Sequence, residues 1–468
     1  MMEERENLRR HLLQAVKTLR PHGRLLEEIV QYLLPLLVLK AVSDTKGQID
    51  ATKPLKAEFT LPWSQGLAFS LQLPQLVKDF FVQLRTENPT WSQAIPFISL
   101  DSRDAERLAE LVIPLSGFTF DPNYLPPSAG IEILMDVLTE DRSQEFQDPR
   151  DLAQLAAALL DAEPGMSLLD PACGKGSLLV EAAKQIAAKF PHDAELDIYG
   201  QDKQENLIKF CQMSMLMHGF QPEALSQGDT LTEPLKNKAQ SLLLVDRVVC
   251  TPPVGHLDTE QLKTLSGLPS RLKMALEPKF LRQILSSLNE RGRAVVVLLH
   301  GLLFRSGEEE KLRRSIIQTD TLETVINLPR GIFHMTPIAA AIVVLNRAKQ
   351  VDRQNKVLFL DASSLGTKDR RGKSTLSGED IASIVEATKN FGSQKMLAQE
   401  VTVEKIMDNL YDLNPNLYLF SSLPVPDINV SELRDNAREK ELLFNQSTEA
   451  FHRTLEPFGI SETDDSHR

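Results

Sequence analysis

The sequence predicts an α/β protein with a doubly wound, mostly parallel sheet and helical segments before and after it. Three observations support this prediction: short apolar runs alternate with helical stretches through the middle of the chain, a Gly-rich turn joins the first run to a helix, and the first 118 residues show helical periodicity only. We therefore expect a helical N-terminal domain over 1–118, a sheet domain over 119–388, and a C-terminal helical segment and tail over 389–468.

The N-terminal domain is predicted from apolar residues that recur three and four positions apart. They occur in ENLRRHLLQAVKTL, LLEEIVQYLLPLLVLKAV, LPQLVKDFFVQL and DAERLAELVIPL. Residues 116–130 are rich in Pro and Gly, which indicates a linker. The stretch from about Lys389 is interpreted as helical or irregular.

The sheet domain is predicted from short aliphatic runs separated by helical stretches, an alternation typical of parallel strands joined by helices. The helical stretches include SLLVEAAKQIAAKF and ENLIKFCQMSMLMHG, and EEEKLRRS at 308–315 is interpreted as a solvated helix with paired charges. The predicted strands are MSLLD, DIYGQD, LLLVDRVVC, GRAVVVLLH, LETVINLP and AAAIVVLN.

Composition narrows the possible function classes. The three cysteines, Cys173, Cys211 and Cys250, are far apart and lack metal-ligand spacing, so we expect neither a disulfide framework nor a metal site. The N-terminus lacks the pattern of a signal peptide, and the apolar stretch 32–42 is too short to span a bilayer, which predicts a cytoplasmic protein without a membrane partner. The formal net charge of -12 means that a basic partner or a local basic face must recruit any nucleic acid.

A ligand site is predicted where the first strand runs into the turn Asp170-Pro-Ala-Cys-Gly174-Lys-Gly176-Ser. Glycines at 174 and 176 allow positive φ angles and a close approach of the backbone to a ligand. Asp170 would face that ligand, and a carboxylate suits a cationic amino group better than a phosphate. Leu179 occupies the place of the third glycine in a dinucleotide-binding turn, which weakens the alternative of a nicotinamide dehydrogenase.

Two further acidic residues follow strands in the order that a βαβαβ unit requires. Asp202 ends the second strand, where a carboxylate can accept hydrogen bonds from both ribose hydroxyls. Asp229 follows the third strand and can accept a hydrogen bond from an adenine amino group. Together with the Gly-rich turn, these residues predict a nucleoside-type ligand.

These motifs resemble those of the modification (methyltransferase) subunit of type I restriction–modification systems, a family of N6-adenine DNA methylases. DPACGKGSLL, YGQDKQENLIKFCQMSMLMHG and NLYDLNPNLYL carry the resemblance, which covers about residues 5 to 420. It implies a class I, Rossmann-like methyltransferase fold, S-adenosylmethionine as cofactor, DNA as substrate, and a separate specificity subunit with, in some assemblies, a restriction subunit. The cofactor-binding residues that it implies are Asp170, Ala172, Gly174, Gly176, Asp202 and Asp229.

The family's catalytic motif, Asn/Asp-Pro-Pro-aromatic after the fourth strand, corresponds here to Thr251, Pro252, Pro253 and Val254. In that motif the side-chain oxygen and the first Pro carbonyl accept the two N–H bonds of adenine N6, and the aromatic ring stacks on the flipped base. Thr251 has a shorter side chain and Val254 has no π face. The family's Tyr-Thr-Pro near the cofactor reads Tyr124-Leu125-Pro126 here.

Several alternatives stay open at this point. A catalytically inactive subunit with a structural or DNA-positioning role is favoured by Thr251 and Val254. A methyltransferase acting on a protein glutamine or on RNA uses a similar Pro-Pro motif, but the helical N-terminal domain argues against it. The basic loop KDRRGKS at 368–374 is either a phosphate contact or a plain surface loop.

Overall fold

The structure is a computed structural model, and it describes most of the first 419 residues. Residues 1–419 form one compact unit, and 420–468 form a second unit that lies outside the described residues. Within the described part of the chain, no helix is long and apolar enough to cross a membrane. The described ranges are 2–22, 25–49, 55–56, 71–139, 148–191, 195–253, 276–333, 339–370, 372–392 and 397–419.

The N-terminal residues are helical, as predicted. The α3 helix is buried along almost its whole length, and even its Lys40 is only 1% exposed because its Nζ pairs with Asp44 at 3.0 Å. The elements are α1 (Met2–Leu19), η1 (Arg20–His22), α2 (Leu25–Glu28), η2 (Ile29–Leu33), α3 (Leu34–Thr45), α5 (Leu73–Glu87), η3 (Pro89–Trp91), η4 (Ser102–Asp104) and α6 (Ala105–Leu115).

The predicted linker at 116–130 is wrong in its last residues, because α7 (Pro127–Thr139) begins inside it. Pro127 is the first helical residue, a position where proline's missing N–H has no intrahelical partner to lose. The apolar side chains that follow are buried, and α7 packs against α1 and α10 (Glu205–Met217). Burial of that face therefore outweighs the Pro- and Gly-rich composition.

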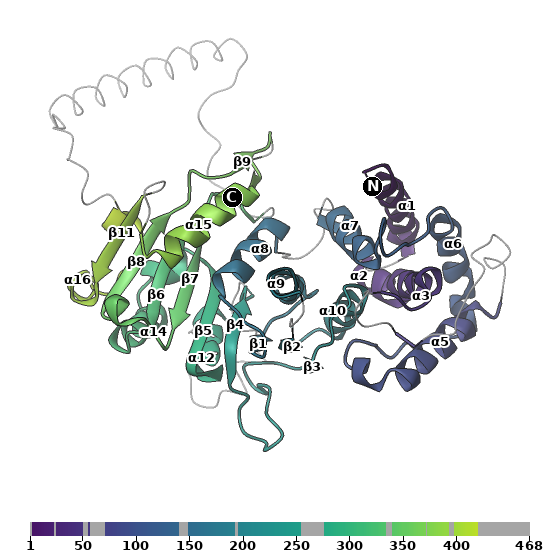
Figure 1. Cartoon of the computed structure of the whole chain (residues 1–468), viewed down its shortest axis with the longest axis horizontal. Helices are drawn as coiled ribbons and strands as arrows, with labels where there is room; N and C mark the ends of the chain where they lie inside the picture. Colours follow the sequence, from purple (N-terminus) through teal and green to yellow (C-terminus); the bar gives the residue numbers. More distant parts are fainter. Residues whose placement is uncertain are drawn as a thin grey trace, which may run out of the picture. The chain divides into compact units, whose positions relative to one another are not determined.

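A sheet of nine strands forms the centre of the unit, in the order β11-β8-β6-β7-β5-β4-β1-β2-β3 (Figure 1). All neighbours from β5 to β3 pair in parallel, and so do β6 and β8, whereas β7 and β11 are antiparallel to their neighbours. The strands are β1 (Ser167–Asp170), β2 (Asp197–Asp202), β3 (Ala224–Gln227), β4 (Val245–Cys250), β5 (Leu288–Leu299), β6 (Leu322–Asn327), β7 (Ala340–Asn346), β8 (Lys356–Asp361) and β11 (Ala398–Thr402).

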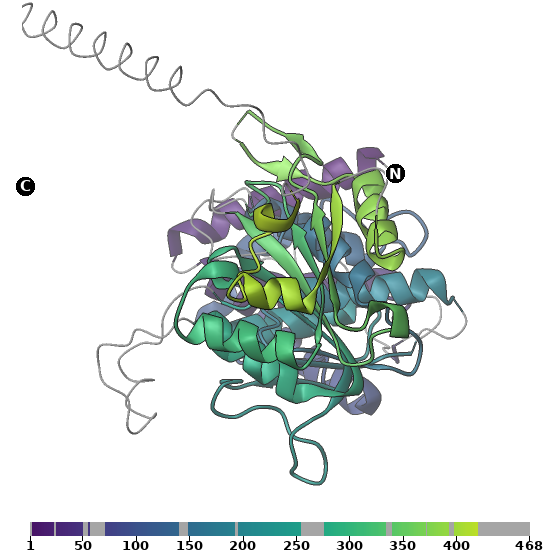
Figure 2. The ribbon, with the colours of Figure 1, turned by 90° about the vertical axis from the view of Figure 1, so that its left-hand side faces the viewer.

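Helices cover both faces of the sheet, which confirms the doubly wound class (Figure 2). Neighbouring residues of one strand belong to different core clusters: Leu168 packs with side chains from α9, and Leu169 with side chains from α12 and α14. The alternation places one apolar core on each face. The remaining helices are α8 (Arg150–Leu159), α9 (Ser177–Lys189), α12 (Leu276–Ser287), α13 (Gly301–Phe304), α14 (Glu308–Gln318), α15 (Gly378–Lys389), α16 (Val403–Asp408) and α17 (Asn416–Leu419), with η5 at Val351–Arg353.

One prediction about local structure is wrong, and a second is confirmed in its helix and its paired charges but not in its full exposure to solvent. The stretch after Lys389 contains β11, which pairs with β8 at the end of the sheet, where the buried strand needs a hydrogen-bonding neighbour. The α14 helix is not simply solvated, because Arg313 is only 2% exposed. Its guanidinium donates to the carbonyls of Tyr411, Leu302 and Arg305, each at 2.8 Å.

Candidate functional site

The Gly-rich turn after β1 has the backbone conformation that its glycines predict. Gly174 has φ +52 and Gly176 has φ +88, and α9 begins at the next residue, Ser177. A Cβ at Gly174 would meet no atom within 4 Å, whereas one at Gly176 would lie 2.7 Å from the Cys211 sulfur. Gly174 therefore borders open space where a ligand can approach, while Gly176 allows the helix to pack closely.

Asp170 lies at the carboxyl end of β1 and is only 1% exposed. One carboxylate oxygen accepts a hydrogen bond from the Ala172 N–H at 3.0 Å. Burial raises the pKa of Asp170 well above its usual value, and the negative charges of Asp148 and Asp202 raise it further, although the Ala172 bond opposes them. A cationic group of a ligand would relieve this repulsion.

The acidic residues after β2 and β3 lie at the same edge of the sheet, because β1, β2 and β3 are parallel neighbours. Asp202 accepts hydrogen bonds from Gly174 N at 3.0 Å and from Gln204 N at 2.9 Å. Asp229 accepts from Leu231 N at 3.0 Å, and its second oxygen is 3.3 Å from Lys203 Nζ. The Gly174 contact holds the Asp202 carboxylate beside the Gly-rich turn. Thr230, the residue after Asp229, is tied to the same turn because its hydroxyl donates to the Pro171 carbonyl at 2.6 Å.

Thr251, Pro252 and Pro253 directly follow β4, whose neighbour in the sheet is β1. The strand pairing brings Cys250 close to Asp170, since the Cys250 thiol interacts with that carboxylate. The Thr251 hydroxyl is buried, and it lies near enough to the Asp148 carboxylate to act on it as a hydrogen-bond donor. Val254 lies outside the described residues, so its predicted place in the base site stays a prediction.

Asp148 is a residue of this site that the sequence reasoning missed. Burial raises its pKa to about 6, and the nearby Thr251 hydroxyl acts in the opposite direction. The Asp-Pro pair in the sequence marks only the start of α8, where Pro149 occupies the N-cap, and gives no sign of a place in the site. Tyr124, which was expected near the cofactor, is 66% exposed in a turn closed by Asp121 and Leu125.

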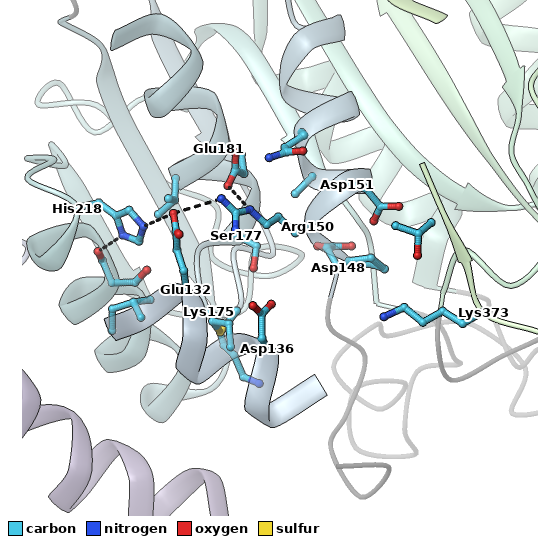
Figure 3. A pocket seen from close by; sticks show the side chains of 18 residues that line it. Glu132, Asp136, Asp148, Arg150, Asp151, Lys175, Ser177, Glu181, His218 and Lys373 are labelled. Carbon is cyan, nitrogen blue, oxygen red and sulfur yellow. Dashed lines mark hydrogen bonds and ion pairs between the residues drawn. The ribbon is translucent and has the colours of Figure 1, made fainter. Parts of the chain in front are cut away.

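A cavity of about 300 Å³ adjoins the turn and is lined by Asp148, Lys175 and Ser177, together with side chains from α7, α8, α9 and α10 (Figure 3). Ion pairs fix its wall on the α7 side. Glu132 lies 2.9 Å from Lys184 and 3.0 Å from Arg5. Burial alone would raise the pKa of Glu132, but these cations and Arg150 lower it to about 2.

The remaining candidate groups have structural surroundings. A hydrogen bond with the neighbouring Cys211, followed by burial, raises the pKa of the Cys173 thiol well above its usual value, so Cys173 is a packing residue. Among the described residues, no group of three or more His, Cys, Asp or Glu side chains is arranged to hold a metal ion. The groups that line this edge are carboxylates, the Thr251 hydroxyl and backbone groups.

The fold and the Gly-rich edge together define a class I methyltransferase architecture. A type I restriction–modification methyltransferase subunit from Streptococcus thermophilus superposes with a TM-score of 0.70 at 20% identity, over 89% of this chain and 100% of that one. The modification subunit of a putative type I restriction enzyme from Vibrio vulnificus gives 0.68 at 18% identity, over 91% and 99%. These similarities establish the fold.

The chain belongs to the N-6 DNA Methylase family, whose profile matches residues 131–423. It is 29% identical over 321 residues to the MjaVII methylase subunit of Methanocaldococcus jannaschii, covering 64% of this chain and 54% of that protein. It is 25% identical over 389 residues to the HindI methylase subunit of Haemophilus influenzae, covering 77% and 85%. The chain spans about half the length of the first curated relatives that it matches.

Proposed function

We propose that this chain is the methyltransferase subunit of a DNA modification assembly and transfers a methyl group from S-adenosylmethionine to adenine N6. One observation carries the proposal. Asp170 and the Gly174–Gly176 turn lie at the end of β1, directly beside the Thr251-Pro252-Pro253 segment at the end of β4. A cofactor site and an amine-binding site therefore share one edge of the sheet.

The residues at this edge fit the proposed cofactor. Asp170 would accept hydrogen bonds from the amino group of S-adenosylmethionine, whose positive charge would stabilise a carboxylate that burial disfavours. Asp202 would accept from the ribose hydroxyls and Asp229 from the adenine amino group, each through lone pairs beyond those that its backbone donors use. Ala172 and Gly174 would bring the backbone close to the cofactor. The bound cofactor would supply an electrophilic methyl group.

The Thr251 segment would act on the target amine. The lone pair of adenine N6 is delocalised into the ring, so acceptors for its two N–H bonds favour a nucleophilic nitrogen. The Pro252 carbonyl and the Thr251 hydroxyl oxygen supply two such acceptors. If the Thr251 proton is directed to the Asp148 carboxylate, the lone pairs of its oxygen remain to accept an N–H. Pro253 would fix the segment, and Val254 would replace the aromatic stack with an apolar contact.

The proposal extends to partners and location. Several relatives are named methylase subunits of type I restriction enzymes, which supports an assembly with a specificity subunit and a restriction subunit. The net charge of -12 supports a separate DNA-reading partner, because phosphate contacts need clustered cations. A cytoplasmic location, where such an assembly would meet DNA, belongs to the same proposal.

The experiment is expression of the full chain, with and without the genes encoded beside it, in a host that lacks adenine methylation. Long-read sequencing of the host DNA should then reveal N6-methyladenine at a recurring site. The matched control, Asp170→Asn, should lower the methylated fraction of that site. If wild-type protein with its partners leaves adenine unmodified, the double variant Thr251→Asn/Val254→Phe separates the remaining explanations. If the double variant methylates adenine, the natural chain is an inactive subunit whose Thr251 and Val254 no longer support the reaction. If the double variant is also inactive, the result counts against the proposed chemistry.

A further inference from the structure

A short β-hairpin at the carboxyl edge of the sheet carries cations that have no acidic partner. Its strands are β9 (Thr367–Lys368) and β10 (Ser374–Thr375), and they pair antiparallel. Lys368 and Arg370 are exposed, and Lys373 is half-buried. None of the three forms an ion pair with a residue that the structure describes.

Some cations elsewhere on the chain do have acidic partners. Arg282 pairs with Glu308 at 2.8 Å, and Lys349 pairs with Asp320 at 2.6 Å. In a chain with a net charge of -12, most of the surface repels a polyanion. The hairpin contains one acidic residue, Asp369, whose carboxylate accepts from the Lys373 backbone N–H at 2.9 Å. Its cations outnumber that acid, act together within a Debye length of about 10 Å, and make a local site for negative charge.

The fold holds this hairpin in one position. Ser374 N donates to the Gly331 carbonyl at 3.0 Å, and Ser374 Oγ donates to the Arg330 carbonyl at 2.6 Å. Gly331 has φ +82, and a Cβ there would lie 2.2 Å from the Gly372 carbonyl oxygen, so the close approach requires glycine. The contact also places the exposed Arg330 beside the hairpin.

The hairpin also reaches the candidate site. Lys373 and Thr375 line the same cavity as Asp148 and Lys175, and Figure 3 shows the Lys373 side chain directed toward that cavity. The Leu376 N–H donates to the Asp151 carboxylate at 2.6 Å, which ties the base of the hairpin to α8. Lys373 therefore lies next to the place where the proposed reaction occurs, and Lys368 and Arg370 belong to the same short hairpin.

We propose that the hairpin 367–375, with Arg330, contacts the phosphate backbone of duplex DNA next to the target adenine. A base enters such a site by rotating out of the duplex, so its own phosphates must lie at the mouth of the site. Contacts there position the strand without reading its sequence. The inference deepens the proposed function, because it names the surface of this chain that would meet the substrate of that reaction.

The experiment measures binding of a short fluorescein-labelled DNA duplex to the full chain by anisotropy, at salt concentrations from about 50 to about 200 mM. The test variant is Lys368→Gln/Arg370→Gln. The control, Arg291→Gln/Lys405→Gln, removes the same charges from exposed positions near the amino ends of β5 and β8, at the opposite edge of the sheet. Thermal unfolding checks that both variants remain folded.

The test variant should bind about ten- to a hundredfold more weakly near 0.1 M salt, and its salt slope should fall by about two. The control should bind like wild type. Equal affinities for the two doubles, or no binding of duplex by wild type even at the lowest salt, would overturn the hairpin contact. S-adenosylmethionine binding to the same test variant is measured by calorimetry. If the variant still binds the cofactor, a negative DNA result refutes only the hairpin contact and leaves the proposed function in place.

Discussion

The raised pKa of Asp148 predicts a specific dependence of stability on pH. An aspartate has a pKa of about 3.9 in an unfolded chain, whereas Asp148 has a pKa of about 6 in the fold. Between these values the folded protein retains a proton that the unfolded chain has released. Stability therefore falls as pH rises from about 4 to about 6, and the loss persists at higher pH.

The perturbation is Asp148→Asn, which keeps the shape of the side chain and removes its charge. The pKa of Asp148 is about two higher in the fold than in the unfolded chain, which corresponds to about 3 kcal/mol in the free energy of unfolding. Because Asp148 is partly exposed, this value is an upper limit. We expect the variant to match wild type near pH 4 and to be about 1–3 kcal/mol more stable at neutral pH.

Urea unfolding of both proteins, at a series of pH values and without ligand, measures this difference. Asp170 also has a raised pKa, so the pH dependence of stability in wild type alone reflects both carboxylates. The difference between wild type and the variant contains only the contribution of Asp148, including its effect on the pKa of Asp170. If the difference in free energy of unfolding between wild type and Asp148→Asn stays constant from acid to neutral pH, ionisation of Asp148 does not destabilise the fold, and the reasoning is refuted.

Three further predictions follow from the same contacts. Gly176→Ala should destabilise the fold by about 1–3 kcal/mol in urea unfolding, because Gly176 has φ +88 and the new Cβ would lie 2.7 Å from the Cys211 sulfur. Gly174→Ala places its Cβ in open space, so it should lose cofactor affinity with a smaller loss of stability. A larger loss of stability in Gly174→Ala than in Gly176→Ala would contradict this. Arg313→Met should lower the free energy of unfolding by about 3 kcal/mol, because it leaves three carbonyls without their donor. The control Arg314→Met, on the exposed side of α14, should lower it by less than about 1 kcal/mol. Equal losses in urea unfolding would show that the buried contacts of Arg313 contribute nothing. Binding of cationic S-adenosylmethionine should release protons and should weaken as pH falls below about 6, because the ligand favours the ionised forms of Asp148 and Asp170. Calorimetry in buffers of different ionisation enthalpy measures the protons released. Proton uptake on binding would contradict the prediction.

The sequence predicted the centre of the sheet well, because each strand there carries its own local signal. DIYGQD was predicted as a strand and forms β2 with the same limits, and the turn after MSLLD has positive φ at both Gly174 and Gly176. These features depend on local properties, namely aliphatic runs and the freedom of glycine. The predicted domain limits at 118 and 388 stay predictions.

The errors occur where distant parts of the chain decide the local structure. The β11 strand has only one buried side chain, Val401, and exists because β8 needs a neighbour. Arg313 is buried because carbonyls from α13, before α14, and from the turn after α16 accept its hydrogen bonds. Asp148 joins the site only when α8 packs beside α9, which no local pattern reveals.

The central claim, that the edge around Asp170 binds S-adenosylmethionine, is tested most directly by calorimetric titration of the purified full chain. We predict one site with micromolar affinity for S-adenosylmethionine and for S-adenosylhomocysteine, and a loss of about ten- to a hundredfold for S-adenosylmethionine in Asp170→Asn. A folded wild-type protein that binds neither compound would contradict the claim, and the chain would then have kept the methyltransferase fold without its cofactor.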